Sequence, residues 1–112
     1  MPRAYVPDAG DVVWLNFDPQ TGREQRGHRP ALVISPASYN AKTDLMICCP
    51  MTTQIKGYPF EVLIAGKPPS AVLSDQVKSV DWVERRASFK ARVSPETMSD
   101  VKRKIYALLG RP

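Results

Sequence analysis

Residues 24–30 (EQRGHRP) place a carboxylate, two guanidinium groups and an imidazole within seven positions. Arg26 and Arg29 can each bind a pair of phosphate oxygens through the planar guanidinium fork. Glu24 can accept a proton or hold an arginine in place, and His28, the only histidine, is the residue type that most often acts as a general base. Arg29 stands directly before a proline and an apolar run, so a strand would hold it more firmly than a loop tip would. The segment is therefore either a solvated connection or a phosphate-binding catalytic loop.

The surrounding loop, residues 18–30 (DPQTGREQRGHRP), adds charge and backbone freedom. Arg23 supplies a third guanidinium, and the glycines at positions 22 and 27 let the backbone approach a ligand closely. A loop of this composition suits a phosphate cradle as well as a solvated basic surface.

A second polar segment, residues 50–59 (PMTTQIKGYP), follows an apolar run. It offers neutral hydrogen-bonding groups, one cation and one aromatic ring: Thr52, Thr53, Gln54, Lys56 and Tyr58. Threonines in this position are ordinarily turn or cap residues, but a hydroxyl beside an arginine can also bind a phosphate oxygen. Arg29 and Thr52 each adjoin a predicted strand, so neighbouring strands of a small barrel could bring them together.

Several classes of site are excluded by the residues present. A single histidine rules out a paired-histidine ribonuclease mechanism, and there is no Ser-His-Asp spacing, no phosphate-binding glycine loop and no carboxylate cluster for magnesium. Cys48 and Cys49 are adjacent, so in a strand they point to opposite faces and do not bond to each other. We expect both to be buried free thiols that pack like small apolar residues, which suits a protein of a reducing compartment. We therefore expect no metal and no cofactor, and phosphodiester cleavage, if the chain performs it, proceeds without metal.

The elements that must position these groups are mostly strands. Short runs rich in apolar, β-branched and aromatic residues alternate with turn signals, at residues 11–17, 31–34, 45–51, 60–64, 71–73, 77–83 and 89–93. Pro50 indicates that the run at 45–51 ends at an edge or a bulge. Many short strands separated by turns indicate a small barrel or a strongly bent sheet.

The last twenty residues change to a helical period. Ser94, Pro95 and Glu96 read as an N-cap, a proline at the first helical position and an acid at the positive end of the dipole. Gly110 suits the stop. The apolar positions that fall on one helical face are Met98, Val101, Ile105, Leu108 and Leu109. Lys102, Arg103 and Lys104 fall on the other side, late in the helix, and we expect a solvated face there.

Length and charge bound the rest. The 112 residues predict one domain spanning 1–112, with 43% hydrophobic and 24% charged residues as in an ordinary globular protein. The apolar runs are too short to cross a bilayer and no signal-like segment follows the first residues, which predicts a cytoplasmic protein with no membrane partner. A formal charge of +5 favours a polyanionic partner.

Taken together, these motifs resemble the MazF/PemK family of toxins, in order and over nearly the whole chain. The segments that carry the resemblance are 5–11 (YVPDAGD), 17–19 (FDP), 24–25 (EQ), 27–31 (GHRPA), 39–40 (YN), 52–54 (TTQ), 56–62 (KGYPFEV) and 75–79 (DQVKS). The resemblance implies a mainly β (α+β) fold, a small Src-homology-3-like barrel of the MazF/PemK/CcdB type with a C-terminal helix, forming a homodimer. It implies the toxin of a type II toxin–antitoxin system: a metal-independent, sequence-specific endoribonuclease of single-stranded RNA that inhibits translation and growth. Its expected partners are single-stranded RNA and an acidic MazE-like antitoxin.

The catalytic residues of that family fall on Arg29 and Thr52, and its loop carboxylate falls on Glu24. In RNA the 2′-hydroxyl can attack the adjacent phosphorus, leaving a cyclic phosphate and a 5′-hydroxyl. Arg29 suits the negative phosphorane and Thr52 can bind the phosphate. The general base is Glu24 or His28, with Glu24 preferred. The candidates for binding RNA are Arg23, Arg26, His28, Thr53, Gln54, Lys56, Asp75, Gln76 and Lys78.

Two other functions share this fold class. One is a CcdB-like toxin that binds gyrase, which depends on a tryptophan near the C-terminus; this chain ends LGRP and has the Arg29/Thr52 pair that CcdB lacks. The other is a non-catalytic barrel that only binds nucleic acid. The chain departs from the family pattern at Arg23, where a small residue is usual, and at the short proline-containing stretch 66–71. Either departure could alter the preferred RNA sequence.

Overall fold

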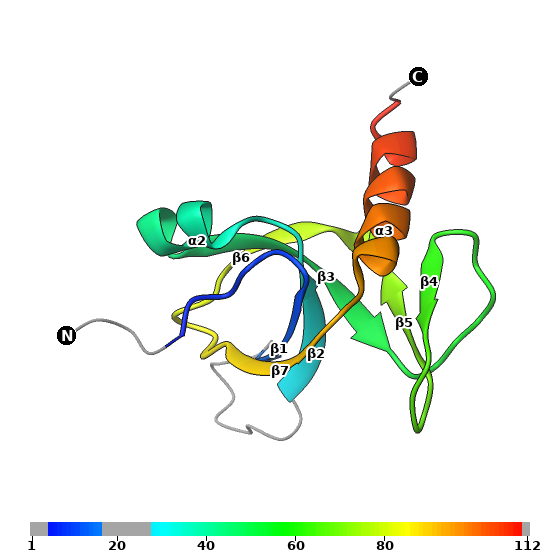
Figure 1. The fold of residues 1–112 in the computed structure, drawn as a ribbon, viewed down its shortest axis with the longest axis horizontal. Helices are drawn as coiled ribbons and strands as arrows, with labels where there is room; N and C mark the ends of the chain where they lie inside the picture. The colour runs from blue at the N-terminus through cyan, green and yellow to red at the C-terminus, as the bar shows by residue number, and fades with distance from the viewer. Residues whose placement is uncertain (1–4, 17–27, 111–112) are drawn as a thin grey trace.

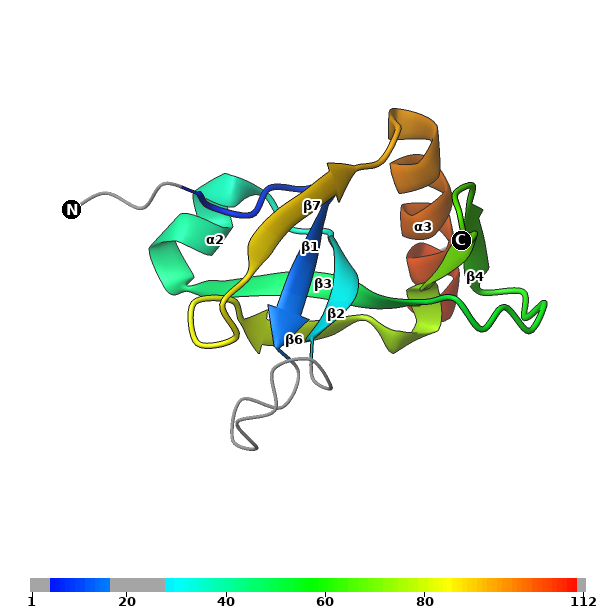
Figure 2. The same ribbon diagram turned by 90° about the horizontal axis from the view of Figure 1, so that it is seen from below.

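The computed structural model describes residues 5–16 and 28–110, which form a curled, antiparallel sheet with a helix at its C-terminal end (Figures 1 and 2). The helices are α2 (Ala37–Thr43) and α3 (Pro95–Leu108), with a 3-10 turn, η1 (Ser74–Gln76). The strands are β1 (Asp11–Asn16), β2 (His28–Val33), β3 (Leu45–Thr52), β4 (Glu61–Ile64), β5 (Ser70–Leu73), β6 (Lys78–Asp81) and β7 (Ser88–Arg92). The expected mainly β fold with a C-terminal helix is confirmed, in the form of a half-barrel.

Strand β3 organises the sheet. The order is β4-β5-β3-β2-β1-β7, and β6 also pairs with β3. One edge of β3 pairs with β2, while the other pairs first with β6, through Leu45 to Cys48, and then with β5, through Met51 and Thr52. The sequence associated Pro50 with an edge or a bulge at the end of this run. In the structure Pro50 lies within β3, which continues to Thr52. It lies where the second edge passes from β6 to β5, a place in the ladder where a missing N–H is tolerated.

The two faces of the sheet bury two different clusters. Leu32 and Cys49 pack beneath α3 with Val101 and Ile105, whereas Val33 and its paired residue Cys48 pack inside the curl with Trp82 and other apolar residues. Burial on both faces explains why the second half of β2, residues 31–33, and most of β3 are nearly continuous apolar runs.

The two cysteines are free, buried and on opposite faces, as their adjacency predicts. Burial raises the pKa of Cys48 to about 11 and that of Cys49 to about 12. Both thiols therefore stay protonated at neutral pH and are no candidates for nucleophiles.

Helix α3 begins as the sequence predicts. The Ser94 hydroxyl accepts a hydrogen bond from the Thr97 N–H at 3.1 Å, and Val101 and Ile105 are buried against the sheet. The C-terminal end of the helix extends beyond the sheet, however, so the expected apolar positions Leu108 and Leu109 are 45% and 73% exposed. The cationic triplet lies in the middle of this helix instead of its last turn, which contains no basic residue.

Helix α2 has no counterpart among the elements expected from the sequence. Seven residues are too few for a periodic signal, and its N-cap residue, Pro36, makes no side-chain cap bond. Asn40 anchors it. The fully buried side-chain amide donates to the main-chain carbonyls of Pro7 and Ser35, and the main-chain carbonyl of Asn40 accepts from the Trp82 indole N–H. Tertiary hydrogen bonds therefore hold this helix in place.

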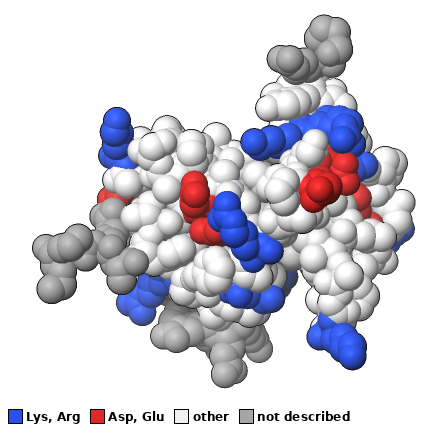
Figure 3. Space-filling model, in the orientation of Figure 1, with Lys and Arg blue, Asp and Glu red and all other residues white. Residues whose placement is uncertain are grey.

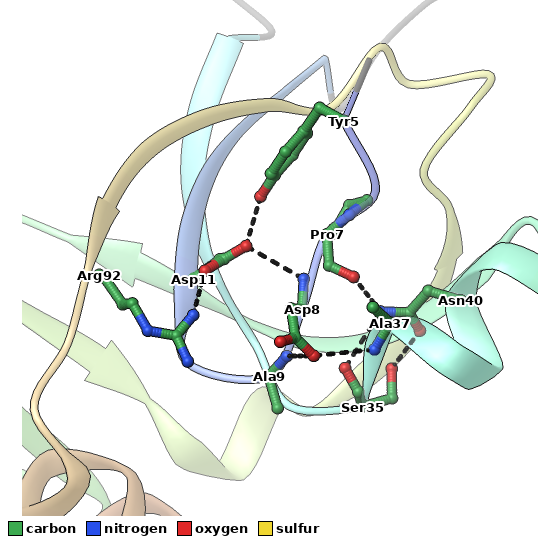
Figure 4. A network of polar contacts seen from close by, with 9 residues as sticks. All are labelled: Tyr5, Pro7, Asp8, Ala9, Asp11, Ser35, Ala37, Asn40 and Arg92. Atoms are coloured by element: carbon green, nitrogen blue, oxygen red, sulfur yellow. Dashed lines mark hydrogen bonds and ion pairs between the residues drawn. The ribbon is translucent and has the colours of Figure 1, made fainter. Parts of the chain in front are cut away.

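A polar network ties the N-terminal segment to this helix and to β7 (Figure 4). The buried Asp11 carboxylate accepts hydrogen bonds from the Tyr5 hydroxyl at 2.6 Å and from the Asp8 N–H, and it forms an ion pair with Arg92. The Asp8 carboxylate in turn accepts from the Ala37 N–H at the start of α2. Much of the family-like segment 5–11 thus serves the scaffold.

The described residues contain no helix that is both long enough and apolar enough to cross a membrane.

Candidate functional site

A pocket of about 170 Å³ lies where β3, β4 and η1 converge. It is lined by Thr52, Gln54, Lys56, Tyr58, Glu61, Leu73, Asp75 and Gln76. The strand register explains this grouping: Thr52 pairs with Ala71 on β5, and Glu61 of β4 pairs with Leu73 at the far end of the same strand. The pocket therefore brings together six of the residues singled out from the sequence, from the two separate segments 52–58 and 75–76.

Thr52 is the last residue of β3 and is half-buried. Its Oγ1 accepts a hydrogen bond from the Gln54 N–H at 3.0 Å, which folds the chain into the turn after the strand. Because the oxygen already accepts from the backbone, the hydroxyl proton is left to donate to a ligand. The same group thus performs the ordinary turn role and keeps a donor for the pocket.

Arg29 lies on β2, next to β3. The pairs Ala31–Pro50, Leu32–Cys49 and Val33–Cys48 define the register, and Arg29 and Thr52 each lie two residues beyond the last of these pairs. Side chains alternate along a strand, so Arg29 shares a face with Ala31, two residues further on, and Thr52 shares a face with Cys48, four residues before it. Ala31 and Cys48 belong to the same buried cluster, so the two faces are the same. The exposed Arg29 side chain and the Thr52 side chain therefore lie on the face of the sheet opposite α3, beyond the same end of the β2–β3 pairing. Arg29 is not among the residues that line the pocket.

The loop of residues 53–60 forms one wall of the pocket and is held by several hydrogen bonds, among them that of the Ser74 N–H to the Phe60 carbonyl at 3.1 Å. Besides the Thr52 bond at its start, the Glu61 carboxylate accepts from the backbone N–H groups of Lys56 (3.1 Å) and Gly57 (2.8 Å). Lys104 of α3 donates to the carbonyl of Pro59. Glu61 and Leu73 were not among the candidates from the sequence, because a carboxylate and a leucine within strand runs look like ordinary strand residues.

His28 lies elsewhere. Its ring packs against Trp14, with ring centroids 5.0 Å apart, and it lines a separate pocket of about 100 Å³ with Asn16, Arg85 and Arg86. In the pleat of β2 it takes the face opposite to its neighbour Arg29. The structure therefore separates His28 from the Thr52 pocket.

The remaining candidates are distributed as follows. Thr53 is exposed and is not among the residues lining the pocket, and Lys78 begins β6, opposite Cys48. Arg23, Glu24 and Arg26 lie outside the described residues. Within the described part of the chain, no three His, Cys, Asp or Glu side chains are grouped so that they could hold a metal ion.

Charge on the face shown in Figure 3 does not form a continuous track over the described surface. Basic side chains gather over α3, and elsewhere single cations are separated by neutral surface and by carboxylates. The pocket itself combines one cation with the carboxylates of Glu61 and Asp75. The phosphates of a nucleic-acid backbone would therefore have to pair with Arg29 and Lys56, while the other polar groups of the pocket suit hydrogen bonds to base edges.

Comparison with known proteins identifies the family. The family model for the PemK-like, MazF-like toxin of type II toxin–antitoxin systems matches residues 8–109. The endoribonuclease toxin MazF of Escherichia coli K12 is 53% identical over 107 residues, covering 95% of this chain and 96% of that protein. Among solved structures, MazF of Deinococcus radiodurans superposes with a TM-score of 0.84 at 51% identity, covering 95% of this chain and 98% of that chain. A MazE–MazF complex from the same organism gives a TM-score of 0.85 at 45% identity, covering 96% and 99%.

The match extends over the strands, the pocket loop and the C-terminal helix alike, and it agrees with the resemblance seen in the sequence motifs. The chain belongs to the PemK-like, MazF-like toxin family of type II toxin–antitoxin systems.

Proposed function

We propose that this toxin is an endoribonuclease that cleaves single-stranded RNA across the face formed by Arg29 and Thr52. The observation that supports it best is the register of β2 and β3, which places Arg29 and Thr52 on one face of the sheet, just beyond the same end of the pairing, with Thr52 lining a polar pocket. The relative from E. coli that is 53% identical is itself an endoribonuclease. The site of action is the cytoplasm, where the RNA is.

The reaction is an internal phosphoryl transfer. The 2′-oxygen forms a bond to phosphorus while the bond from phosphorus to the 5′-oxygen breaks, leaving a 2′,3′-cyclic phosphate and a 5′-hydroxyl. One proton leaves the 2′-hydroxyl and one must reach the departing 5′-oxygen. Arg29 stabilises the phosphorane charge through two parallel hydrogen bonds. Thr52 donates to a non-bridging oxygen, since its own oxygen is already occupied by the Gln54 N–H.

Glu24 is the proposed general base. The position of His28 supports this choice, because its ring packs against Trp14 and takes the opposite face from Arg29. General-base catalysis typically contributes about 10²–10⁴ in rate. We propose that the reaction needs no metal and no cofactor.

The other pocket residues are proposed to bind the RNA bases and backbone. Gln54 and Gln76 offer amide donors and acceptors, Asp75 offers an acceptor for an exocyclic amino group, and the exposed Tyr58 ring offers a stacking face. Lys56 and Lys78 provide charge for the backbone, and Arg23, Arg26 and Thr53 complete the RNA-binding set.

The protein partners follow from the same family. A solved complex of MazE with MazF from D. radiodurans aligns with 96% of this chain, which supports a MazE-like antitoxin as the neutralising partner and a homodimer as the active assembly. The formal charge of +5 supports an acidic antitoxin. A pull-down with the small acidic protein encoded next to the toxin should recover a complex at moderate salt, and recovery of none would contradict this partner.

The test of the activity is RNA cleavage in EDTA. Wild type, Arg29→Ala and Arg103→Ala are incubated with a long single-stranded RNA, and every cut end is mapped. Arg103 is the matched control, because it is an exposed arginine on α3 paired with Asp100. We expect discrete cuts at one short motif with cyclic-phosphate ends for wild type and Arg103→Ala, and none for Arg29→Ala. Absence of cleavage by folded wild type, or full activity of Arg29→Ala, would overturn the proposal.

A further inference from the structure

A carboxylate inside a pocket proposed to bind RNA is unexpected, because it repels phosphate. Glu61 lines the pocket beside Lys56 and Tyr58. We propose that Glu61 is a positioning residue that sets the shape of the RNA-contacting loop, residues 53–60, and thereby determines RNA affinity and cleavage selectivity. This inference rests on the proposed function, and the experiment below separates the two.

Both oxygens of the Glu61 carboxylate are used by the loop backbone. Oε1 accepts from the Gly57 N–H at 2.8 Å and Oε2 accepts from the Lys56 N–H at 3.1 Å. The Glu61 N–H also donates to the Tyr58 carbonyl at 3.1 Å, so the same residue closes the turn from the other side. Hydrogen bonds to a charged acceptor are roughly twice as strong as neutral ones.

Glu61 is itself well placed to act as a fixed support. It is the first residue of β4, is half-buried, and pairs with Leu73 across the sheet. Strand β4 is in turn packed through Val62 against the cluster beneath α3. The carboxylate therefore connects a rigid strand to the middle of the loop.

The loop has few other supports. Its residues from Thr53 to Pro59 are all exposed, and Gly57 has a left-handed φ of +80° with no atom near its missing side chain. The bonds from Thr52, from Lys104 and from the Ser74 N–H to the Phe60 carbonyl hold only its two ends. Among the described residues, the Glu61 carboxylate is the side chain that holds the middle, between the proposed RNA contacts Gln54, Lys56 and Tyr58.

The pocket's other carboxylate provides a contrast. Asp75 is exposed on η1 and lines the pocket, so its carboxylate can reach a base. Two backbone N–H dipoles compensate the charge of Glu61, which reduces its repulsion of phosphate. The two carboxylates of the pocket thus have different roles: one shapes the loop and the other meets the ligand.

The test compares wild type with Glu61→Gln, Glu61→Ala and Glu84→Gln. Glu84 is an exposed glutamate in the turn after β6, and its substitution makes the same change in net charge away from the pocket. Each protein is assayed for KM and kcat on a short RNA containing the mapped wild-type site, and for the ratio of cutting at that site to cutting at near-matches. Thermal unfolding and the hydrogen exchange of the Lys56 and Gly57 amides are measured alongside.

We expect KM to rise about tenfold or more in Glu61→Ala and by a smaller factor in Glu61→Gln, which keeps one acceptor, while kcat changes less than about threefold. The selectivity ratio should fall in the same order, and the Lys56 and Gly57 amides should exchange faster. Glu84→Gln should match wild type in all of these. If Glu61→Ala does not fold, the isosteric Glu61→Gln decides the outcome alone.

Wild-type KM, selectivity and amide exchange in the folded Glu61 variants would overturn the inference while leaving the nuclease assignment intact. Loss of cleavage through kcat alone would also overturn it, because it would make Glu61 part of the reacting site. Failure of the wild type to cut RNA would instead refute the proposed function.

Discussion

Replacing Thr52 by valine removes the hydroxyl while keeping the β-branched shape that suits the end of a strand. Two hydrogen bonds are at issue. The one from the Gln54 N–H at 3.0 Å is present in the free protein, and the proposed one to a phosphate oxygen would form only with RNA. The substitution therefore has a small effect on stability and a larger effect on the reaction.

The two effects can be estimated separately. An exposed backbone-to-hydroxyl bond contributes about 0.5–1.5 kcal/mol to folding, which corresponds to a fall in Tm of less than about 10 °C for a domain of this size. A hydrogen bond to a charged group contributes about 1.5–3 kcal/mol. If that bond strengthens as the phosphorane forms, its loss lowers kcat/KM by about 10- to 150-fold.

The assay is single-turnover cleavage of a short RNA containing the mapped site, at a temperature well below the Tm of both proteins. Thr97→Val is the matched control, because Thr97 makes an exposed hydroxyl contact with Ser94 in the first turn of α3, away from the pocket. It should lose a comparable amount of stability and retain wild-type cleavage.

Cleavage by folded Thr52→Val within about twofold of wild type would refute the reasoning, since the hydroxyl would then serve the turn alone. Equal losses in Thr52→Val and Thr97→Val would show that the activity follows stability rather than a contact with phosphate.

Three further outcomes are expected. Arg29→Lys keeps the positive charge but loses the planar guanidinium fork, so kcat should fall about 10- to 100-fold with little change in Tm. A kcat equal to that of wild type would show that the charge alone suffices. Asp11→Ala removes a buried hydrogen-bond acceptor and leaves Arg92 without its ion pair. The free energy of unfolding measured in urea should therefore fall by about 2–4 kcal/mol, while the cleavage rate per folded molecule stays unchanged. Burial raises the pKa of Cys48 to about 11 and that of Cys49 to about 12, so the unfolded chain releases these protons first as the pH rises above about 9. Stability should therefore fall between pH 9 and 12, and the Cys48→Ala/Cys49→Ala double variant should show a shallower fall in its urea midpoint.

The sequence predicted the elements whose signals are local. The Ser94 cap and the spacing of Val101 and Ile105 define α3 without reference to the rest of the fold. The adjacency of Cys48 and Cys49 predicted opposite faces because strand geometry alone decides it. Helix α2 was missed because Asn40 holds it through residues far along the chain, Pro7 and Trp82.

The candidate site shows the same division. Arg29 and Thr52 could be named from their residue types and strand-end positions, but their placement on one face depends on a register that runs through Ala31 and Pro50. The start of β2 was predicted three residues too late, since Pro30 looks like a boundary although it is paired with Trp14. Glu61 could not be found from the sequence, because its importance lies in which backbone N–H groups its carboxylate reaches.

The loop of residues 53–60 leaves the scaffold at Thr52 and returns to it at Glu61, and both ends lie on strands that pair with β5. The polar network around Asp11 and Asn40 supports the scaffold from the opposite end of the molecule and makes no contact with this loop in the bonds drawn in Figure 4. The sequence of the loop can therefore be changed without disturbing the contacts that stabilise the rest of the fold. A library randomised at positions 54, 56 and 58, with both anchor residues kept, offers a route to engineered ribonucleases that cut at chosen sequences.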